Sequence, residues 1–139
     1  MTAALLLRIV AVVALLQFVG HGTMFIRARP MHGPQEMAVV EAMQSRAFKF
    51  AAAPRTYWDM YFGYGLEAAF VCLVEAVLFW QLAGGTTCGD TALVRSIAAL
   101  FAVANVAHCV LLVRYFAFPL PMAFDAVIAI GLTAVAVVV

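Results

Sequence analysis

Charged residues are scarce in this sequence. They make up 11% of its 139 residues, whereas hydrophobic residues make up 67%. A soluble domain of similar length carries about 25% charged residues, so this composition argues against a soluble protein. The mean hydropathy of +1.06 indicates a chain that lies largely in lipid. We therefore predict an all-α integral membrane protein that forms a single domain over residues 1–139.

A basic surface is also lacking, because the net charge is only +1. Nucleic-acid binding needs a basic face, so we predict no nucleic-acid partner. The three cysteines are an odd number and no C-x-x-C is present, which argues against a disulfide framework. We expect Cys72 and Cys109, which fall in apolar stretches, to be buried.

Sequence motifs for common cofactors are absent. The chain contains no phosphate-binding loop, dinucleotide fingerprint, nucleophile elbow or haem-type histidine pair, so no cofactor is predicted. It also lacks the H-x-x-x-H, H-E-x-x-H and E-x-x-H spacings of local metal sites. We predict no metal site, although convergence of His21, His108, Glu67 and Asp125 from separate helices cannot be read from spacing.

Four segments are apolar and long enough to cross a bilayer, which takes about 20 residues. They cover roughly residues 3–26, 61–83, 91–113 and 119–139, and they predict a four-helix bundle. The first segment lacks a cleavage site, so we expect a retained span rather than a signal peptide. In the connection 27–60, Pro34 opens a short surface helix with Met37, Val40 and Met43 on one face. An extended or irregular return follows it.

Basic residues predict the orientation of the spans. Six of them lie in the first and third connections and two lie on the opposite side of the membrane. Because basic loops stay inside, we expect the first loop in the cytoplasm and both termini outside. The six are Arg27, Arg29, Arg46, Lys49, Arg55 and Arg114, and the two are Arg8 and Arg95.

Several polar residues interrupt the apolar spans. Such groups are costly in lipid and are functional candidates by default, because they usually face a partner or a water-filled cavity. Each span carries at least one such polar group. At about 1.5 Å per residue, the distances of these groups from the predicted cytoplasmic ends of their spans agree within several ångströms. We therefore expect a polar layer in the cytoplasmic half of the bundle. Its members are His21, Glu67, Asn105, His108 and Asp125, with Gln17 one turn from His21 and Glu75 two turns from Glu67.

This layer has two interpretations. In the first, Glu67 and Asp125 are acid–base groups and His21 and His108 are their partners, because a buried carboxylate beside a histidine can hold a proton for transfer. Gln17, Glu75 and Asn105 then contact the ligand. In the second, the same side chains are hydrogen-bonding links between helices. Whether the protein is an enzyme stays open.

An aromatic stretch precedes Glu67. Aromatic residues alternate there with Asp59 and two glycines, which allow close approach of a helix or ligand. One interpretation is an aromatic belt at the membrane interface. The other is the mouth of a ligand site that leads to Glu67. The residues that would line this mouth are Tyr57, Trp58, Asp59, Tyr61 and Tyr64.

Short motifs in the first 85 residues resemble an uncharacterised family of small four-span bacterial membrane proteins. The motifs are Gly20-His21-Gly22-Thr23, Met43, Phe48-x-Phe50, Arg55-Thr56 and Tyr61-Phe62-Gly63-Tyr64-Gly65. The resemblance implies a four-helix fold and a location in the bacterial inner membrane, and it implies no activity. Leu7-Arg8 and Gly20-His21-Gly22 also give a weaker similarity to DoxX-like four-helix membrane proteins.

Three functions fit these observations. The first is binding of a membrane lipid or other hydrophobic small molecule beside the polar layer, with or without acid–base chemistry. The second is a non-catalytic accessory or assembly subunit, as a homo-oligomer or in a larger membrane complex. The third is a small proton-coupled transporter, against which the absence of an internal repeat counts.

Overall fold

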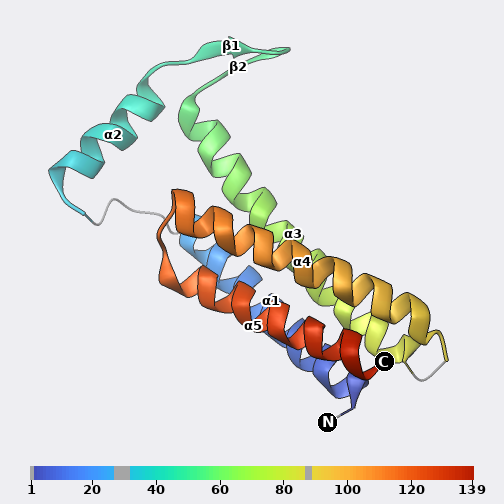
Figure 1. Cartoon of the computed structure of the whole chain (residues 1–139). Coiled ribbons are helices and arrows are strands. Elements are labelled where there is room, and N and C mark those ends of the chain that lie inside the picture. Colours follow the sequence, from blue (N-terminus) through green and yellow to red (C-terminus); the bar gives the residue numbers. More distant parts are fainter. Residues whose placement is uncertain (1, 27–31, 87–88) are drawn as a thin grey trace. The chain divides into compact units, whose positions relative to one another are not determined.

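The computed structural model describes residues 2–26, 32–86 and 89–139. Within them the chain forms helices and one short hairpin (Figure 1). The elements are α1 (Ala3–Ile26), α2 (Pro34–Ser45), β1 (Phe48–Phe50), β2 (Ala53–Arg55), α3 (Tyr57–Gly85), α4 (Thr91–Tyr115) and α5 (Pro119–Val138). The predicted fold class, an all-α four-helix bundle with a short helix in the first loop, is confirmed.

The helix bounds follow from local sequence. Pro119 lies in the first turn of α5, where a missing backbone N–H costs nothing. Helix α3 begins four residues before the predicted Tyr61, because Thr56 and Asp59 form a reciprocal cap. The Asp59 carboxylate accepts the Thr56 backbone N–H at 2.8 Å, and the Thr56 hydroxyl accepts the Asp59 backbone N–H at 3.1 Å. Helices α3 and α4 each continue two residues past their predicted ends, and α5 ends at Val138.

The first loop contains regular structure. Helix α2 begins after Gly33, whose φ of 89° favours glycine, and none of its residues is buried. The return segment, predicted as extended or irregular, is an antiparallel hairpin in which Phe48 pairs with Arg55 and Phe50 with Ala53. Its three-residue strands are too short to give an alternation that a sequence pattern could reveal.

Within the ranges that the structure describes, four helices have the length and apolar composition of membrane spans: α1, α3, α4 and α5. The protein is therefore an integral membrane protein. Helix α3 has 29 residues, so it is about 43 Å long at about 1.5 Å per residue. The hydrocarbon core of a bilayer is about 30 Å thick. Because membrane helices tilt by no more than about 40°, part of α3 extends beyond this core.

The chain divides into two compact units, which we describe separately. The first unit comprises the residues up to Phe18 together with Cys72–Val139, and the second comprises Val19–Val71. The first unit thus contains most of α1, the second half of α3, and all of α4 and α5. Most of the fully buried side chains belong to it, including Leu7, Phe79, Ile128 and Leu132.

Contacts around the first unit connect its four helices in a ring. The Arg8 guanidinium lies over the Trp80 ring at 5.7 Å and links α1 to α3. Phe79 meets Phe101 edge to face at 5.4 Å and links α3 to α4. Helices α4 and α5 lie side by side (Figure 1).

Helix α5 packs against α1 at Gly131, which completes the ring of helices. A side chain at Gly131 would collide with Val10, so only glycine permits this approach. The ring gives the first unit a packed interior, in which any polar side chain must find a partner.

Candidate functional site

Asp125 is the most deeply buried ionisable group of the first unit, with an exposed fraction of 1%. It lies six residues into α5, about 9 Å from the start of this helix. The Gln17 side chain of α1 donates a hydrogen bond from Nε2 to Asp125 Oδ1 at 2.9 Å, and Gln17 is itself 7% exposed. This bond joins two helices that are far apart in sequence and accounts for one carboxylate oxygen.

The other carboxylate oxygen faces a histidine. His108 of α4 places Nδ1 2.8 Å from Asp125 Oδ2, and the His108 side chain is 52% exposed. The pair therefore has one member sealed in the bundle and one that reaches its surface. Because imidazole can take up a proton at one nitrogen and release it at the other, this geometry can pass a proton between Asp125 and the outside.

Glu75 brings α3 into the same region. Its side chain is partly buried and interacts electrostatically with Asp125 and His108. All four membrane-spanning helices thus contribute a polar group to one place. We refer to Gln17, Glu75, His108 and Asp125 as the Asp125 cluster.

A groove of about 370 Å³ between α4 and α5 reaches the Asp125 cluster. Its walls are almost entirely aliphatic, and its two strongly polar side chains, Asn105 and Asp125, are both nearly buried. We refer to it as the α4–α5 groove. It is lined by Asn105, Val106, Cys109, Val110, Val113, Asp125, Ala126, Ala129 and Ile130.

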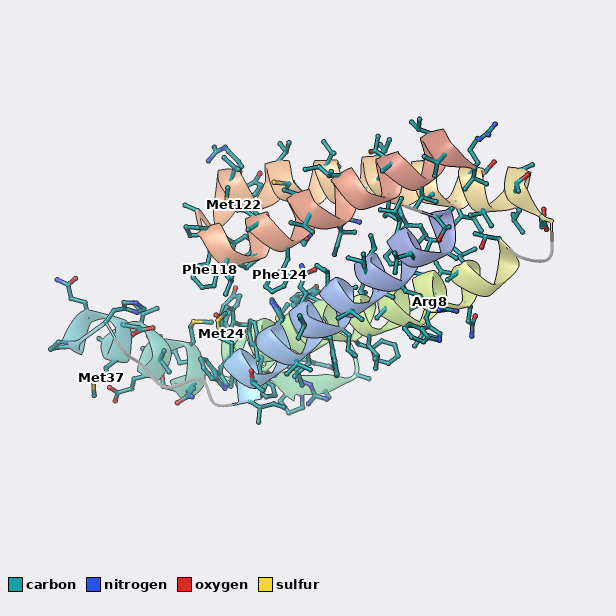
Figure 2. All side chains as sticks on the ribbon, turned by 90° about the horizontal axis from the view of Figure 1, so that it is seen from below. Arg8, Met24, Met37, Phe118, Met122 and Phe124 are labelled. Carbon is teal, nitrogen blue, oxygen red and sulfur yellow. The ribbon has the colours of Figure 1, made fainter. Side chains whose placement is uncertain are left out.

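Asn105 makes a bond within its own helix, because its amide nitrogen donates to the Phe101 carbonyl at 2.9 Å. This leaves its carboxamide oxygen as an acceptor beside the groove. The Cys109 thiol approaches the Met122 carbonyl at 3.9 Å, so α4 and α5 also meet at the end of the groove. Figure 2 shows Met122 there, with Phe118 and Phe124 also near the start of α5.

The second unit contains the remaining candidates. His21 is partly buried, and its ring lies 5.0 Å from the Phe25 ring, centroid to centroid. The Phe25 ring lies 5.3 Å from Tyr61, which lies 5.7 Å from Trp58. Tyr57 is exposed and packs against Phe48 of the hairpin at 4.9 Å. The aromatic stretch therefore holds α1, the hairpin and α3 together within this unit.

Glu67 differs from Asp125 in its surroundings. It is exposed, and it lines a second groove of about 370 Å³ between the hairpin and α3. We refer to this as the hairpin–α3 groove. It is lined by Phe50, Arg55, Asp59, Met60, Gly63, Tyr64 and Glu67.

The structure thus brings together Gln17, Glu75, His108 and Asp125, with Asn105 in the adjoining groove. His21, Glu67 and the aromatic residues belong to the other unit. That all of them act as one layer stays a prediction. Sequence reasoning did not select Val106, Cys109, Ala126 or Arg55, because single apolar or interfacial residues carry no pattern that distinguishes a groove from lipid-facing surface.

In the part of the chain that the structure describes, no three His, Cys, Asp or Glu side chains are grouped so as to hold a metal ion. The contacts of the Asp125 cluster offer hydrogen bonding and proton exchange.

The fold and this cluster define the class: an integral membrane four-helix bundle with a polar cluster inside its spans. No protein-family model matches the chain, and neither the curated proteins nor the solved structures contain a match.

Proposed function

We propose that this protein binds a membrane lipid or another hydrophobic small molecule in the α4–α5 groove, with Asp125 and His108 recognising a polar group on it. The observation that carries the proposal is the position of Asp125. It is 1% exposed, contacted from α1 and α4, and placed on the wall of an otherwise apolar groove. A carboxylate inside a membrane span is costly and is usually kept for function.

The groove favours a ligand with a long apolar part and one hydrogen-bonding group. Its aliphatic walls suit a hydrocarbon chain, because binding sites for such ligands combine apolar walls with a few fixed polar groups. The polar group of the ligand would sit near Asp125 and Asn105. A hydroxyl or an amine could donate to either oxygen acceptor.

Acid–base chemistry on the bound molecule is the finer form of this proposal. His108 touches Asp125 through Nδ1 and is half exposed, so its second ring nitrogen can exchange a proton with the ligand or with water. Proton exchange by this pair would let Asp125 alternate between charged and neutral forms without leaving the bundle.

We place the protein in a bacterial inner membrane, as a member of the small four-span family that its first 85 residues resemble. The first loop lies in the cytoplasm and both termini lie outside, as the six-to-two distribution of basic residues favours. Cysteines introduced at Gln35 and Gly85, in a variant without native cysteines, should react with impermeant reagents from the inside and the outside, respectively. The reverse labelling would overturn this topology.

Filling the groove tests the binding proposal. In Ala126→Phe a ring occupies the α4–α5 groove, whereas Ala99→Phe adds the same ring to an exposed position of α4 outside it. Hydrophobic molecules extracted from purified wild-type protein and from the Ala99→Phe control should include a species that Ala126→Phe lacks.

Asp125→Asn separates ligand recognition from helix linkage. The amide keeps the shape and hydrogen-bonding capacity of the side chain but removes its charge. Loss of the copurifying species with a melting temperature lowered by only a few degrees supports a ligand site. Identical extracts from wild type, Ala126→Phe and Asp125→Asn would contradict it and would favour an accessory subunit in which the Asp125 cluster links helices.

A further inference from the structure

The hairpin–α3 groove is chemically unlike the α4–α5 groove, because it contains charges of both signs. Arg55 extends from the hairpin, Glu67 lies on α3, and the Phe50 and Tyr64 rings lie beside them. Both charged side chains are exposed. A groove with this lining does not suit a purely apolar ligand.

The two opposite charges do not neutralise each other. Neither Arg55 nor Glu67 forms an ion pair with any residue in the described ranges 2–26, 32–86 and 89–139. Among the described residues, the Arg55 guanidinium donates only to the carbonyl of the adjacent Pro54, at 2.9 Å. The groove therefore offers a cation and an anion that are both available to a ligand.

Asp59, the third charged residue of the groove, is already engaged. Its carboxylate caps α3 by accepting the Thr56 backbone N–H. Glu67 is thus the carboxylate that a ligand can use.

The length of α3 places this groove at the level of the lipid headgroups. The short connection between Gly85 and Thr91 keeps the far end of α3 at one membrane surface. A span of about 20 residues counted back from Gly85 reaches roughly Gly65. The groove residues from Asp59 to Tyr64 then lie beyond the hydrocarbon, with Glu67 near its boundary.

We infer that the hairpin–α3 groove binds a zwitterionic phospholipid headgroup that carries an ammonium and a phosphate. Arg55 pairs with the phosphate, because guanidinium matches phosphate geometry. Glu67 and the Tyr64 ring receive the ammonium, which carboxylates and aromatic faces both attract. An anionic headgroup without an ammonium would use Arg55 alone and leave Glu67 repelling it.

The test compares two lipids with identical acyl chains. Delipidated wild-type protein in detergent is titrated with dioleoyl phosphatidylethanolamine or dioleoyl phosphatidylglycerol, and bound lipid is counted by native mass spectrometry. We expect the ethanolamine lipid to bind about tenfold more tightly, as a charge-assisted hydrogen bond allows. Equal binding, or preference for the glycerol lipid, would overturn the inference without any variant having to fold.

Matched variants test whether the preference for the ethanolamine lipid depends on the charges of Glu67 and Arg55. Glu67→Gln should remove the preference for the ethanolamine lipid, whereas Glu41→Gln, an exposed change on α2, should keep it. Arg55→Gln should weaken binding of both lipids, whereas Arg46→Gln should not. If the α2-side controls had the same effect as the groove variants, general surface charge would explain the binding and the site would be wrong.

Two further measurements test whether the ligand is a lipid and whether this site is independent of the α4–α5 groove. Soluble glycerophosphoethanolamine should compete only at far higher concentration than the lipid, and equally tight binding would mean that the ligand is soluble and not a lipid. Ala126→Phe, which fills the α4–α5 groove, should leave the headgroup preference unchanged. Loss of the preference in that variant would contradict an independent site.

Discussion

Asp125 and Glu67 are both carboxylates within membrane-spanning helices, yet their surroundings are opposite. Asp125 is sealed in the first unit, with Gln17 on one oxygen and His108 on the other. Glu67 is exposed in the second unit and forms no ion pair with a described residue. The comparison teaches that an acidic residue in an apolar segment has two solutions. It has polar partners inside the bundle, or it lies exposed at the surface.

The largest difference in stability between the two sites is expected when each carboxyl group is removed. Asp125→Ala leaves the buried Gln17 amide without its acceptor and removes the carboxylate that faces His108, so we expect a loss of about 1–3 kcal/mol in unfolding free energy, the cost of an unsatisfied buried group. Glu67→Ala removes an exposed side chain and should change it by less than about 0.5 kcal/mol. Denaturation of both variants in the same detergent measures the difference, and equal losses would contradict the assigned surroundings.

Close packing should distinguish positions within each unit. Gly131→Ala pushes a methyl group against Val10, and overpacking of this kind costs about 1–3 kcal/mol. Gly65→Ala meets the Phe25 ring in the second unit and should also destabilise.

The controls for these two changes are Gly20→Ala and Gly63→Ala, where an added Cβ has nothing within 4 Å. Both should be neutral or stabilising, because alanine favours a helix by about 0.5–1 kcal/mol. Thermal unfolding followed by circular dichroism compares the four variants. Destabilisation of a control as large as that of its partner would show that the packing account is wrong.

Replacing each carboxylate by the matching amide separates its effect on stability from its effect on ligand binding. Asp125→Asn should lower the stability by only about 0.6 kcal/mol, the average for a polar contact between helices in membranes, while ligand binding in the α4–α5 groove is lost. Glu67→Gln should leave stability unchanged and alter only the headgroup preference. Measuring stability and bound lipids on the same preparations tests both, and loss of the groove ligand in Glu67→Gln would mean that the two carboxylates act together.

The smallest effect is expected at the exposed contact between Arg8 and Trp80. Their cation–π geometry, with 5.7 Å from the guanidinium carbon to the ring centroid, is worth about 0.5–1 kcal/mol at exposed sites. A double-mutant cycle with Arg8→Gln and Trp80→Leu isolates this coupling energy. A coupling near zero would remove this contact from the links between α1 and α3.

The sequence predicted the fold better than the site. Apolar length and turn residues define the four spans, and the bound that was most in error, the start of α3, depended on the Thr56–Asp59 cap. The direction in which each polar side chain faces was harder to predict. A membrane helix is apolar on both its lipid-facing and its packed sides, so periodicity cannot tell which way Glu67 or Glu75 faces. The depths of His108 and Asp125 in their spans mark both as candidates, but the contacts of Asp125 with Gln17 and His108 depend on how α1, α4 and α5 pack.

The most direct test of the ligand site is photo-crosslinking inside the α4–α5 groove. A benzophenone amino acid at Val106 lines the groove, whereas the same group at Val103, which is 68% exposed, lies outside it. We expect Val106 to capture one defined hydrophobic molecule, which Asp125→Asn abolishes, while Val103 captures the general mixture of membrane lipids. The same adducts at both positions, unaffected by Asp125→Asn, would contradict a ligand site at Asp125.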